Sequence, residues 1–240
     1  MKKNKEITAA ELMAQLQSDS EFVSHQDEQE KARKQREAKY RALAAPILDE
    51  LNSMGVKASA LGDLLRFYAP ISAEITETLL HHLPAINDEV LQEQIVRVLG
   101  SSNEPFNGAG LVKLFESSQS QNLRWAIANT IAEARPLDIT NWVIYAVSNP
   151  LYGQAREMLV LAVARLASAD TAREVLAPLF DIFPGHIAAA LAEFGDEREV
   201  QILRQKLDGY KGWQKKEINR AITHIQKRLK RTSSHIDAVP

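Results

Sequence analysis

The chain has 240 residues, a formal net charge of −2, 45% hydrophobic residues and no cysteine. This hydrophobic content can supply a continuous core, so the composition excludes disorder of the whole chain. The near-neutral charge argues against a protein whose main task is to neutralise nucleic-acid phosphates. The lack of cysteine excludes disulfides, thiolate metal sites and a cysteine nucleophile.

The first residues, Met1-Lys2-Lys3-Asn4-Lys5, resemble the charged start of a signal peptide. Glu6, Glu11 and Gln15 interrupt the segment that follows, so it lacks the apolar stretch of such a signal. No window elsewhere approaches the roughly 20 apolar residues that a membrane-spanning helix needs. We therefore expect a soluble, cytoplasmic protein without a membrane span.

Residues 1–45 are predicted to form a charged N-terminal helical arm. Thr8 and Glu11 have the spacing of a capping box, which favours the start of a short helix. Residues 21–41 are rich in Gln, Glu, Lys and Arg, with opposite charges four residues apart. This pattern is typical of a solvated helix, and the alternative is a helix that packs on a partner or on the segment that follows.

Apolar residues recur at a step of 32 from residue 46 onward. Three columns share the step: Ile47, Leu79, Leu111, Val143 and Val175; Leu48, Leu80, Val112, Ile144 and Leu176; Leu51, Leu83, Phe115, Val147 and Leu179. Positions i, i+1 and i+4 lie on one side of a helix. The columns therefore predict the buried stripe of the first helix in each of five repeated units.

A second helix is predicted in each unit, because another set of apolar residues recurs at about the same step: Leu91, Ile95, Val96 and Leu99; Leu123, Ile127, Ala128 and Ile131; Ala155, Leu159, Val160 and Val163; and, shifted by one, Ala190, Leu191 and Phe194. Asp88 and Ser120 are placed as N-caps, and Gly100 and Gly195 as C-terminal stops. Runs of alternating β-branched residues are missing, which favours an all-α fold.

The segment Asp88-x-x-Leu91-Gln92-x-x-Ile95-Val96-x-Val98-Leu99-Gly100 resembles the second helix of a HEAT-like repeat of the PBS-lyase type. Segments 120–132 and 152–164 repeat the pattern, and segment 56–68 departs furthest because Asp63 falls at an expected core position. The resemblance covers residues 46–231 and implies a right-handed α-solenoid of about five helix pairs. Residues 232–240 are predicted to be a flexible tail.

A catalytic site is not predicted from the sequence. There is no P-loop, dinucleotide fingerprint or Gly-x-Ser-x-Gly elbow. His81 and His82 are adjacent, so on a helix they point to different faces, and no carboxylate–histidine spacing accompanies them. We expect no catalytic residue, no metal and no cofactor.

One enzymatic alternative comes from the same resemblance, since some bacterial alkylpurine DNA glycosylases are HEAT-like solenoids of similar length. Such a protein would bind DNA with a basic concave face, for which Trp125, Trp142 and Arg156 supply residue types. Asp138 and Asp170 lie outside the second helices, however, and the net charge argues against DNA binding.

Positions beside the buried stripe of the second helices are the candidates for binding. Trp125 is the outlier there, because its repeat equivalents Glu93 and Glu157 are charged. Trp and Arg are enriched among residues that carry interface energy, so we predict a partner-binding strip of Gln92, Arg97, Arg124, Trp125, Asn129 and Arg156. The hypothesis is a non-enzymatic scaffold, adaptor or immunity-type inhibitor that binds a protein with an acidic surface. The alternative is that Trp125 packs against a neighbouring helix.

The last predicted helix spans residues 212–231. Its apolar stripe is Trp213, Ile218, Ile222, Ile225 and Leu229, and its other faces carry Lys215, Lys216, Arg220, Lys227, Arg228, Lys230 and Arg231. Terminal repeats need a polar outer face, so this helix is interpreted as a cap. The alternative is a basic helix that contacts an acidic protein, an anionic lipid surface or nucleic acid.

Overall fold

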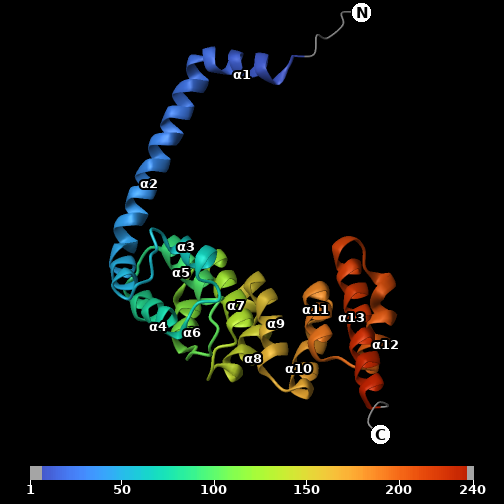
Figure 1. Cartoon of the computed structure of the whole chain (residues 1–240). Coiled ribbons are helices and arrows are strands. Elements are labelled where there is room, and N and C mark those ends of the chain that lie inside the picture. The colour runs from blue at the N-terminus through green and yellow to red at the C-terminus, as the bar shows by residue number, and fades with distance from the viewer. Residues whose placement is uncertain (1–6, 237–240) are drawn as a thin grey trace, which may run out of the picture. The chain divides into compact units, whose positions relative to one another are not determined.

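The computed structural model describes residues 7–236, with side chains described through Arg231. Within that part the chain is all-α and has no strand, and two isolated β-bridges join Ile71 to Ser102 and Asn107 to Leu137 (Figure 1). Contacts divide the chain into two compact units, Met1–Pro46 and Ile47–Pro240. No helix of residues 7–236 combines the length and the apolar character needed to cross a bilayer.

The first unit consists of α1 (Ala9–Ser18) and most of α2 (Ser20–Ser53). The predicted capping box is confirmed, because the Glu11 carboxylate accepts from the Thr8 amide at 3.0 Å while the Thr8 hydroxyl accepts from the Glu11 amide at 3.3 Å. In α2, Arg33 forms ion pairs with Glu30 and Glu37. Such pairs on an exposed helix each stabilise it by only about 0.2–0.5 kcal/mol.

The second unit contains the remaining helices. They are α3 (Leu61–Phe67), α4 (Ala73–His82), α5 (Glu89–Leu99), α6 (Ala109–Ser117), α7 (Gln121–Ala134), α8 (Thr140–Ser148), α9 (Arg156–Leu166), α10 (Ala169–Leu176), α11 (Pro184–Phe194), α12 (Glu197–Lys206) and α13 (Gly212–Ile236). Short 3₁₀ segments are η1 (Leu83–Ala85), η2 (Pro150–Ala155), η3 (Ala177–Leu179) and η4 (Leu207–Gly209). Helix α13 continues through Ile236 of the predicted tail, and residues 237–240 lie outside the described residues.

The predicted helix boundaries are confirmed where a cap was assigned. The Asp88 carboxylate accepts from the Leu91 amide at 3.1 Å, and the Ser120 hydroxyl accepts from the Leu123 amide at 3.3 Å. These bonds satisfy first-turn amides that have no partner within the helix. Gly100 and Gly195 are the C-caps of α5 and α11.

Most residues of the columns at a step of 32 lie in the core. Every member of the third column, from Leu51 to Leu179, is buried, and in the first column only Val175 is half-buried. The middle three members of the second column are half-buried, whereas Leu176 is fully buried. The buried face therefore moves by one residue in α10, which matches the one-residue shift of the pattern in α11.

The second helix of each unit packs against the second helices before and after it. The contacts run from α3 to α5, then to α7, α9, α11 and α13, in chain order. The first helices lie beside this layer, with α8 packed on α9 and α12 on α13 (Figure 1). The side of the second helices that these contacts leave uncovered is only partly accessible, and no residue of α9 is fully exposed.

Hydrogen bonds join the C-terminal ends of these second helices to their neighbours. The Thr130 hydroxyl donates to the Val96 carbonyl at 2.7 Å, and Arg165 Nη1 donates to the Ala132 carbonyl at 3.0 Å. Arg228 likewise donates to carbonyls at the end of α11. The last carbonyls of a helix lack internal partners and carry partial negative charge, so hydroxyl and guanidinium donors stabilise them.

Asp63 explains why segment 56–68 departs from the repeat. Its carboxylate accepts from the Ser59 amide at 2.8 Å, the Ser59 hydroxyl at 2.7 Å and the Ala60 amide at 3.0 Å. The hydrogen bonds from Ser59 are the main reason that the pKa of Asp63 is lowered. The residue thus stabilises the N-terminus of α3, where an apolar side chain would satisfy none of these donors.

A hydrogen bond between Asp181 and Tyr210, the residue that follows η4, gives a prediction for alkaline pH. The Asp181 carboxylate accepts from Lys206 Nζ at 2.8 Å and from the Tyr210 hydroxyl at 2.7 Å. Burial, and secondly the bond to Asp181, raises the pKa of Tyr210 to about 12. An unfolded tyrosine ionises near pH 10, so the contribution of this phenol to stability is present below about pH 10 and is lost as the pH rises towards 12.

We expect an absorbance titration of the tyrosines to contain a component near pH 12 that disappears in Tyr210→Phe. Asp181→Asn should move this component towards lower pH, because it removes the negative charge that opposes ionisation. Asp208→Asn is the control, since this exposed carboxylate pairs with Lys215 and not with Tyr210. A titration of Tyr210→Phe that keeps the late component would contradict the assignment.

Candidate functional site

Three of the predicted strip residues point to the backbone. Gln92 Nε2 donates to the Ile86 carbonyl at 2.6 Å, and Arg124 Nε donates to the Phe115 carbonyl at 3.0 Å. Arg156 Nη1 donates at 3.4 Å to the carbonyl of Val147, the repeat equivalent of Phe115. These three residues occupy the same position in successive units. In each case the side chain connects the start of the second helix to the segment that precedes it.

Arg156 is the clearest departure from the sequence-based expectation. It was expected beside the exposed face, but only 8% of the residue is accessible to solvent. Its guanidinium lies 5.1 Å from the centre of the Phe183 ring, and its Nε donates to the Gly153 carbonyl at 3.1 Å. The physical reason is that the carbonyl of the buried Val147 needs a donor, which a long arginine side chain can supply.

The other two columns of the second helices are partly accessible to solvent: Arg97 is exposed, and the other five members are half-buried. Arg97 forms an ion pair with Glu93 at 2.7 Å, and 45% of the Arg97 side chain is exposed. The Arg97 guanidinium carbon also lies 5.8 Å from the centre of the half-buried Trp125 ring. We define the Trp125 surface as the residues of these two columns, which are Glu93, Arg97, Trp125, Asn129, Glu157 and Leu161.

Charged pairs bridge consecutive second helices along the same face. Arg165 of α9 contacts Glu133 of α7 at 2.9 Å and Glu193 of α11 at 3.0 Å. His186 of α11 lies 4.0 Å from Glu157 of α9. Burial lowers the pKa of His186, although Glu157 opposes this shift. Because side chains of adjacent helices hold one another, this face is preorganised.

The three tryptophans do not share one site. Trp142 Nε1 donates to the Glu116 carboxylate at 2.8 Å, and its ring lies edge-on to Phe115 with centroids 5.2 Å apart. Trp213 lies across Gly185, where an added Cβ would come within 2.2 Å of the indole. The glycosylase alternative combined Trp125 and Trp142 with Arg156, whose guanidinium is in the interior. We therefore do not propose that function.

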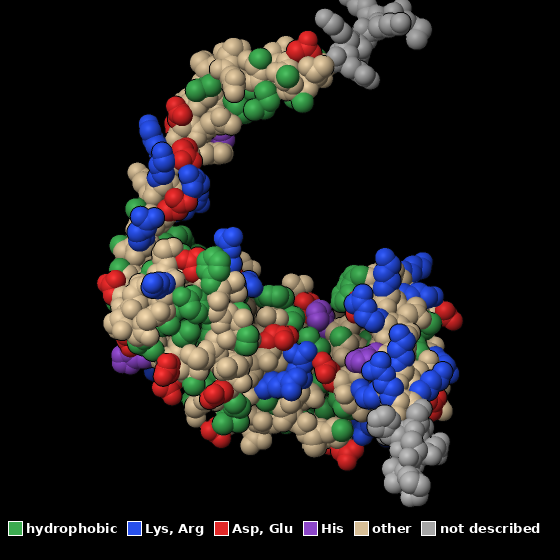
Figure 2. All heavy atoms as spheres, in the orientation of Figure 1, with side chains coloured by type: hydrophobic (Ala, Val, Ile, Leu, Met, Phe, Trp, Pro, Cys, Tyr) green, Lys and Arg blue, Asp and Glu red, His purple; other side chains and the backbone are tan. Residues whose placement is uncertain are grey.

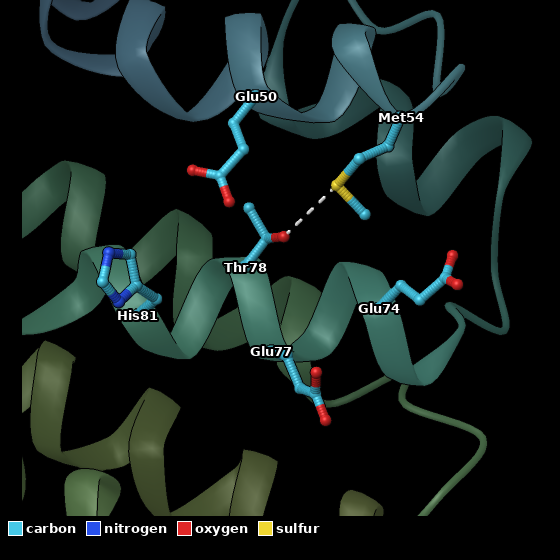
Figure 3. A pocket seen from close by; sticks show the side chains of 6 residues that line it. All are labelled: Glu50, Met54, Glu74, Glu77, Thr78 and His81. Carbon is cyan, nitrogen blue, oxygen red and sulfur yellow. Dashed lines mark hydrogen bonds between the residues drawn. The ribbon is translucent and has the colours of Figure 1, made fainter.

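A pocket of about 530 Å³ lies between the end of α2 and helix α4 (Figure 3). It is lined by Glu50, Met54, Glu74, Glu77, Thr78 and His81. The Thr78 hydroxyl donates to the Met54 sulfur at 3.6 Å, whereas Glu77 points away from Glu50 (Figure 3). The carboxylates of this pocket therefore do not converge on one point.

The adjacent histidines serve different contacts. His82 Nε2 lies 2.7 Å from the Glu50 carboxylate, and His81 lines the pocket described above. Within the described residues no group of three His, Cys, Asp or Glu side chains is arranged to hold a metal ion. Of the two adjacent histidines, only His82 is paired with a carboxylate, and one His–Glu pair is not a metal site.

The chain matches no protein-family model, no curated protein and no solved structure. The site is consequently interpreted from its own chemistry. The columns containing Glu93 and Glu157 could be recognised in the sequence, but the bridges formed by Arg165 and His186 were not predicted. For Arg165 a signal was present, because Glu133 precedes it by one step of 32 and such residues are neighbours across stacked units.

Proposed function

We propose that residues 46–231 form a right-handed α-solenoid of about five HEAT-like helix pairs. The support is the unbroken order of contacts between second helices, together with the step of 32 in the core. Each unit contacts mainly its neighbours, as repeat arrays do. Such an array presents an extended face rather than a closed cavity, which favours binding of a protein over catalysis.

The proposed function is that of a non-enzymatic, cytoplasmic protein-binding scaffold, adaptor or inhibitor that uses the Trp125 surface. The observation that carries it is the Glu93–Arg97–Trp125 contact, which holds an exposed arginine fork beside a half-buried indole. Side chains already ordered in the free protein lose little conformational entropy on binding. Buried Trp and Arg side chains also contribute much of the energy of protein interfaces.

The surface indicates the chemistry of its partner. Leu161 and Trp125 provide apolar contact area, while Arg97 can bond a carboxylate if the partner displaces Glu93. We propose a segment that presents an apolar side chain to the indole and an Asp or Glu to the guanidinium. Exchange of one carboxylate for another conserves the charge-assisted hydrogen bonds, so the apolar contact would supply most of the net affinity.

The test is photo-crosslinking. A photo-reactive amino acid is placed at position 129, next to Trp125 on α7, and the protein is expressed in the cells in which it naturally occurs. We expect a covalent partner adduct that falls at least tenfold when Trp125→Ala and Arg97→Glu are introduced, a loss of about 1.4 kcal/mol or more in binding. Circular dichroism and the melting temperature should stay unchanged, because both residues are partly exposed.

The matched control combines Tyr145→Ala with Lys113→Glu, an exposed aromatic residue and an exposed cation on the first helices α8 and α6. This variant should retain the adduct. Equal adduct yields in wild type and in Trp125→Ala/Arg97→Glu would reject the Trp125 surface, and an equal loss in the control would show that the effect is not local.

A further inference from the structure

Charge is segregated within the second unit. Residues 47–196 contain 9 basic and 18 acidic residues, a net charge of −9, whereas residues 197–231 contain 11 basic and 4 acidic residues, a net charge of +7. Lys and Arg side chains gather over α12 and α13 (Figure 2). A unit with this asymmetry is oriented by a negatively charged surface so that α12 and α13 approach it first.

The cations of α13 follow one line. Successive residues of an α-helix are rotated by 100° about its axis. Five of these cations therefore lie within an arc of about 100° around the helix, along about 22 Å of its length. This set, the α13 stripe, consists of Lys216, Arg220, Lys227, Lys230 and Arg231. The opposite face of the helix is buried and packs on α11 and α12 through Ile218, Ile222 and Ile225.

Most cations of the stripe are not used to hold the fold together. Between residues 7 and 231 no ion pair engages Lys216, Lys227 or Arg231, and all three are exposed. Arg220 pairs with Glu217 of its own helix, and 76% of the Arg220 side chain is exposed. A cap needs polar residues on its outer face, but it does not need them to have the same sign.

The neighbouring cations show the contrast. Arg228 donates to backbone carbonyls of α11, Lys206 pairs with Asp181 at 2.8 Å, and Lys215 pairs with Asp208 at 3.3 Å. These side chains point along or into the protein and have structural contacts. Lys216, Lys227 and Arg231 therefore form a distinct set within the stripe, and their charges are available to an external anion.

The polar residues between the cations argue against nucleic acid as that anion. Asn219 Nδ2 donates to the Lys215 carbonyl at 3.1 Å, and the Thr223 hydroxyl donates to the Asn219 carbonyl at 2.9 Å. Both side chains bond their own helix and are not directed at base edges. Single-stranded nucleic acid is usually held by several aromatic side chains on which bases stack, and the stripe contains none.

The composition also argues against an acidic protein as the partner. Lysine is depleted in protein interfaces, which depend on buried apolar or aromatic anchors, and no apolar residue lies within the stripe. Trp213 lies three residues before Lys216, and 54% of it is exposed. Lysines with a tryptophan at one end suit the headgroup region of a membrane, where an indole is stable and cations are attracted by anionic lipids.

We propose that the outer face of α13 is a peripheral binding site for anionic lipid bilayers. In it the α13 stripe contacts the headgroups and Trp213 lies at their level. This site is separate from the Trp125 surface and does not depend on the function proposed for that surface. Binding is electrostatic, so it weakens as added salt screens the charges.

The experiment measures flotation of the full chain with vesicles of phosphatidylcholine, with and without 30 mol% phosphatidylserine. We expect binding only to the anionic vesicles, and its loss in high salt. The variant Lys216→Gln/Lys227→Gln/Arg231→Gln should bind about a hundredfold more weakly, because each removed charge near the surface contributes a factor of roughly five.

The matched control is Lys57→Gln/Arg66→Gln/Lys113→Gln, which removes two lysines and one arginine from exposed positions elsewhere in the second unit. It should bind like wild type, and so should Trp125→Ala/Arg97→Glu. Failure to bind anionic vesicles, or an equal loss in the control, would overturn the proposal. So would displacement of the vesicles by equimolar duplex DNA, which would make nucleic acid the better ligand.

Discussion

Arg156→Ala is expected to lower the free energy of unfolding of the second unit by about 2–4 kcal/mol. The substitution removes the donor to the Val147 and Gly153 carbonyls and leaves a void against the Phe183 ring. An unsatisfied carbonyl at the buried Val147 and lost packing both destabilise the folded state. The measurement is urea unfolding followed by circular dichroism.

Two further variants separate these causes. Arg156→Met keeps most of the aliphatic packing but removes the hydrogen bonds, so its loss should be smaller than that of the alanine variant. Arg97→Ala is the control, because 45% of this side chain is exposed, its ion pair with Glu93 lies within one helix, and its other contact is with the half-buried Trp125 ring. We expect it to change stability by less than about 0.5 kcal/mol. Equal stabilities of Arg97→Ala and Arg156→Ala would refute the interior role.

Arg173→Ala is expected to have a comparable or larger effect, about 3–5 kcal/mol. Its Nε lies 3.0 Å from the Glu199 carboxylate, and only 3% of the Glu199 side chain is exposed. The hydrogen bond to Glu199 is the main reason that the pKa of Arg173 is raised. Without the guanidinium, a carboxylate stays buried with only the Asp196 amide as a donor to it.

Removal of the charge on Glu199 identifies the cause. Glu199→Gln should restore part of the stability of Arg173→Ala at pH 7. Asp170→Ala is the control, because its carboxylate also pairs with Arg173 but its side chain is 96% exposed. Equal stabilities of Arg173→Ala and Arg173→Ala/Glu199→Gln would argue against an uncompensated charge.

The helical elements of the second unit could be predicted because their causes are local. Apolar residues at i, i+1 and i+4 can be buried on one side only in a helix, and Asp88 and Ser120 stabilise helix starts with bonds to residues three positions away. Segment 56–68 did not fit the repeat as well. The position of Asp63 in the repeat predicted a core residue, but its side chain caps the N-terminus of α3.

The binding strip could be predicted only in part. Arg124 and Arg156 occupy positions next to the buried stripe, as Arg97 and Trp125 do. Side chains at such positions can be either buried or exposed, so the sequence grouped all four residues. Arg124 and Arg156 bond carbonyls nine residues earlier, whereas Arg97 bonds Glu93 and contacts an indole of the next helix. The length of an arginine side chain permits either arrangement, so residue type and spacing did not separate them.

The sequence by itself determined that the chain is helical, where α1, α5 and α7 begin, where α5 and α11 end, and that most residues of the three columns are buried. These properties follow from the period of the helix and from capping by nearby side chains. Only the tertiary structure decided which polar side chains face solvent. That outcome depends on which buried carbonyls and carboxylates need a partner, as those near Arg156 and Arg173 do, and these partners come from distant parts of the chain.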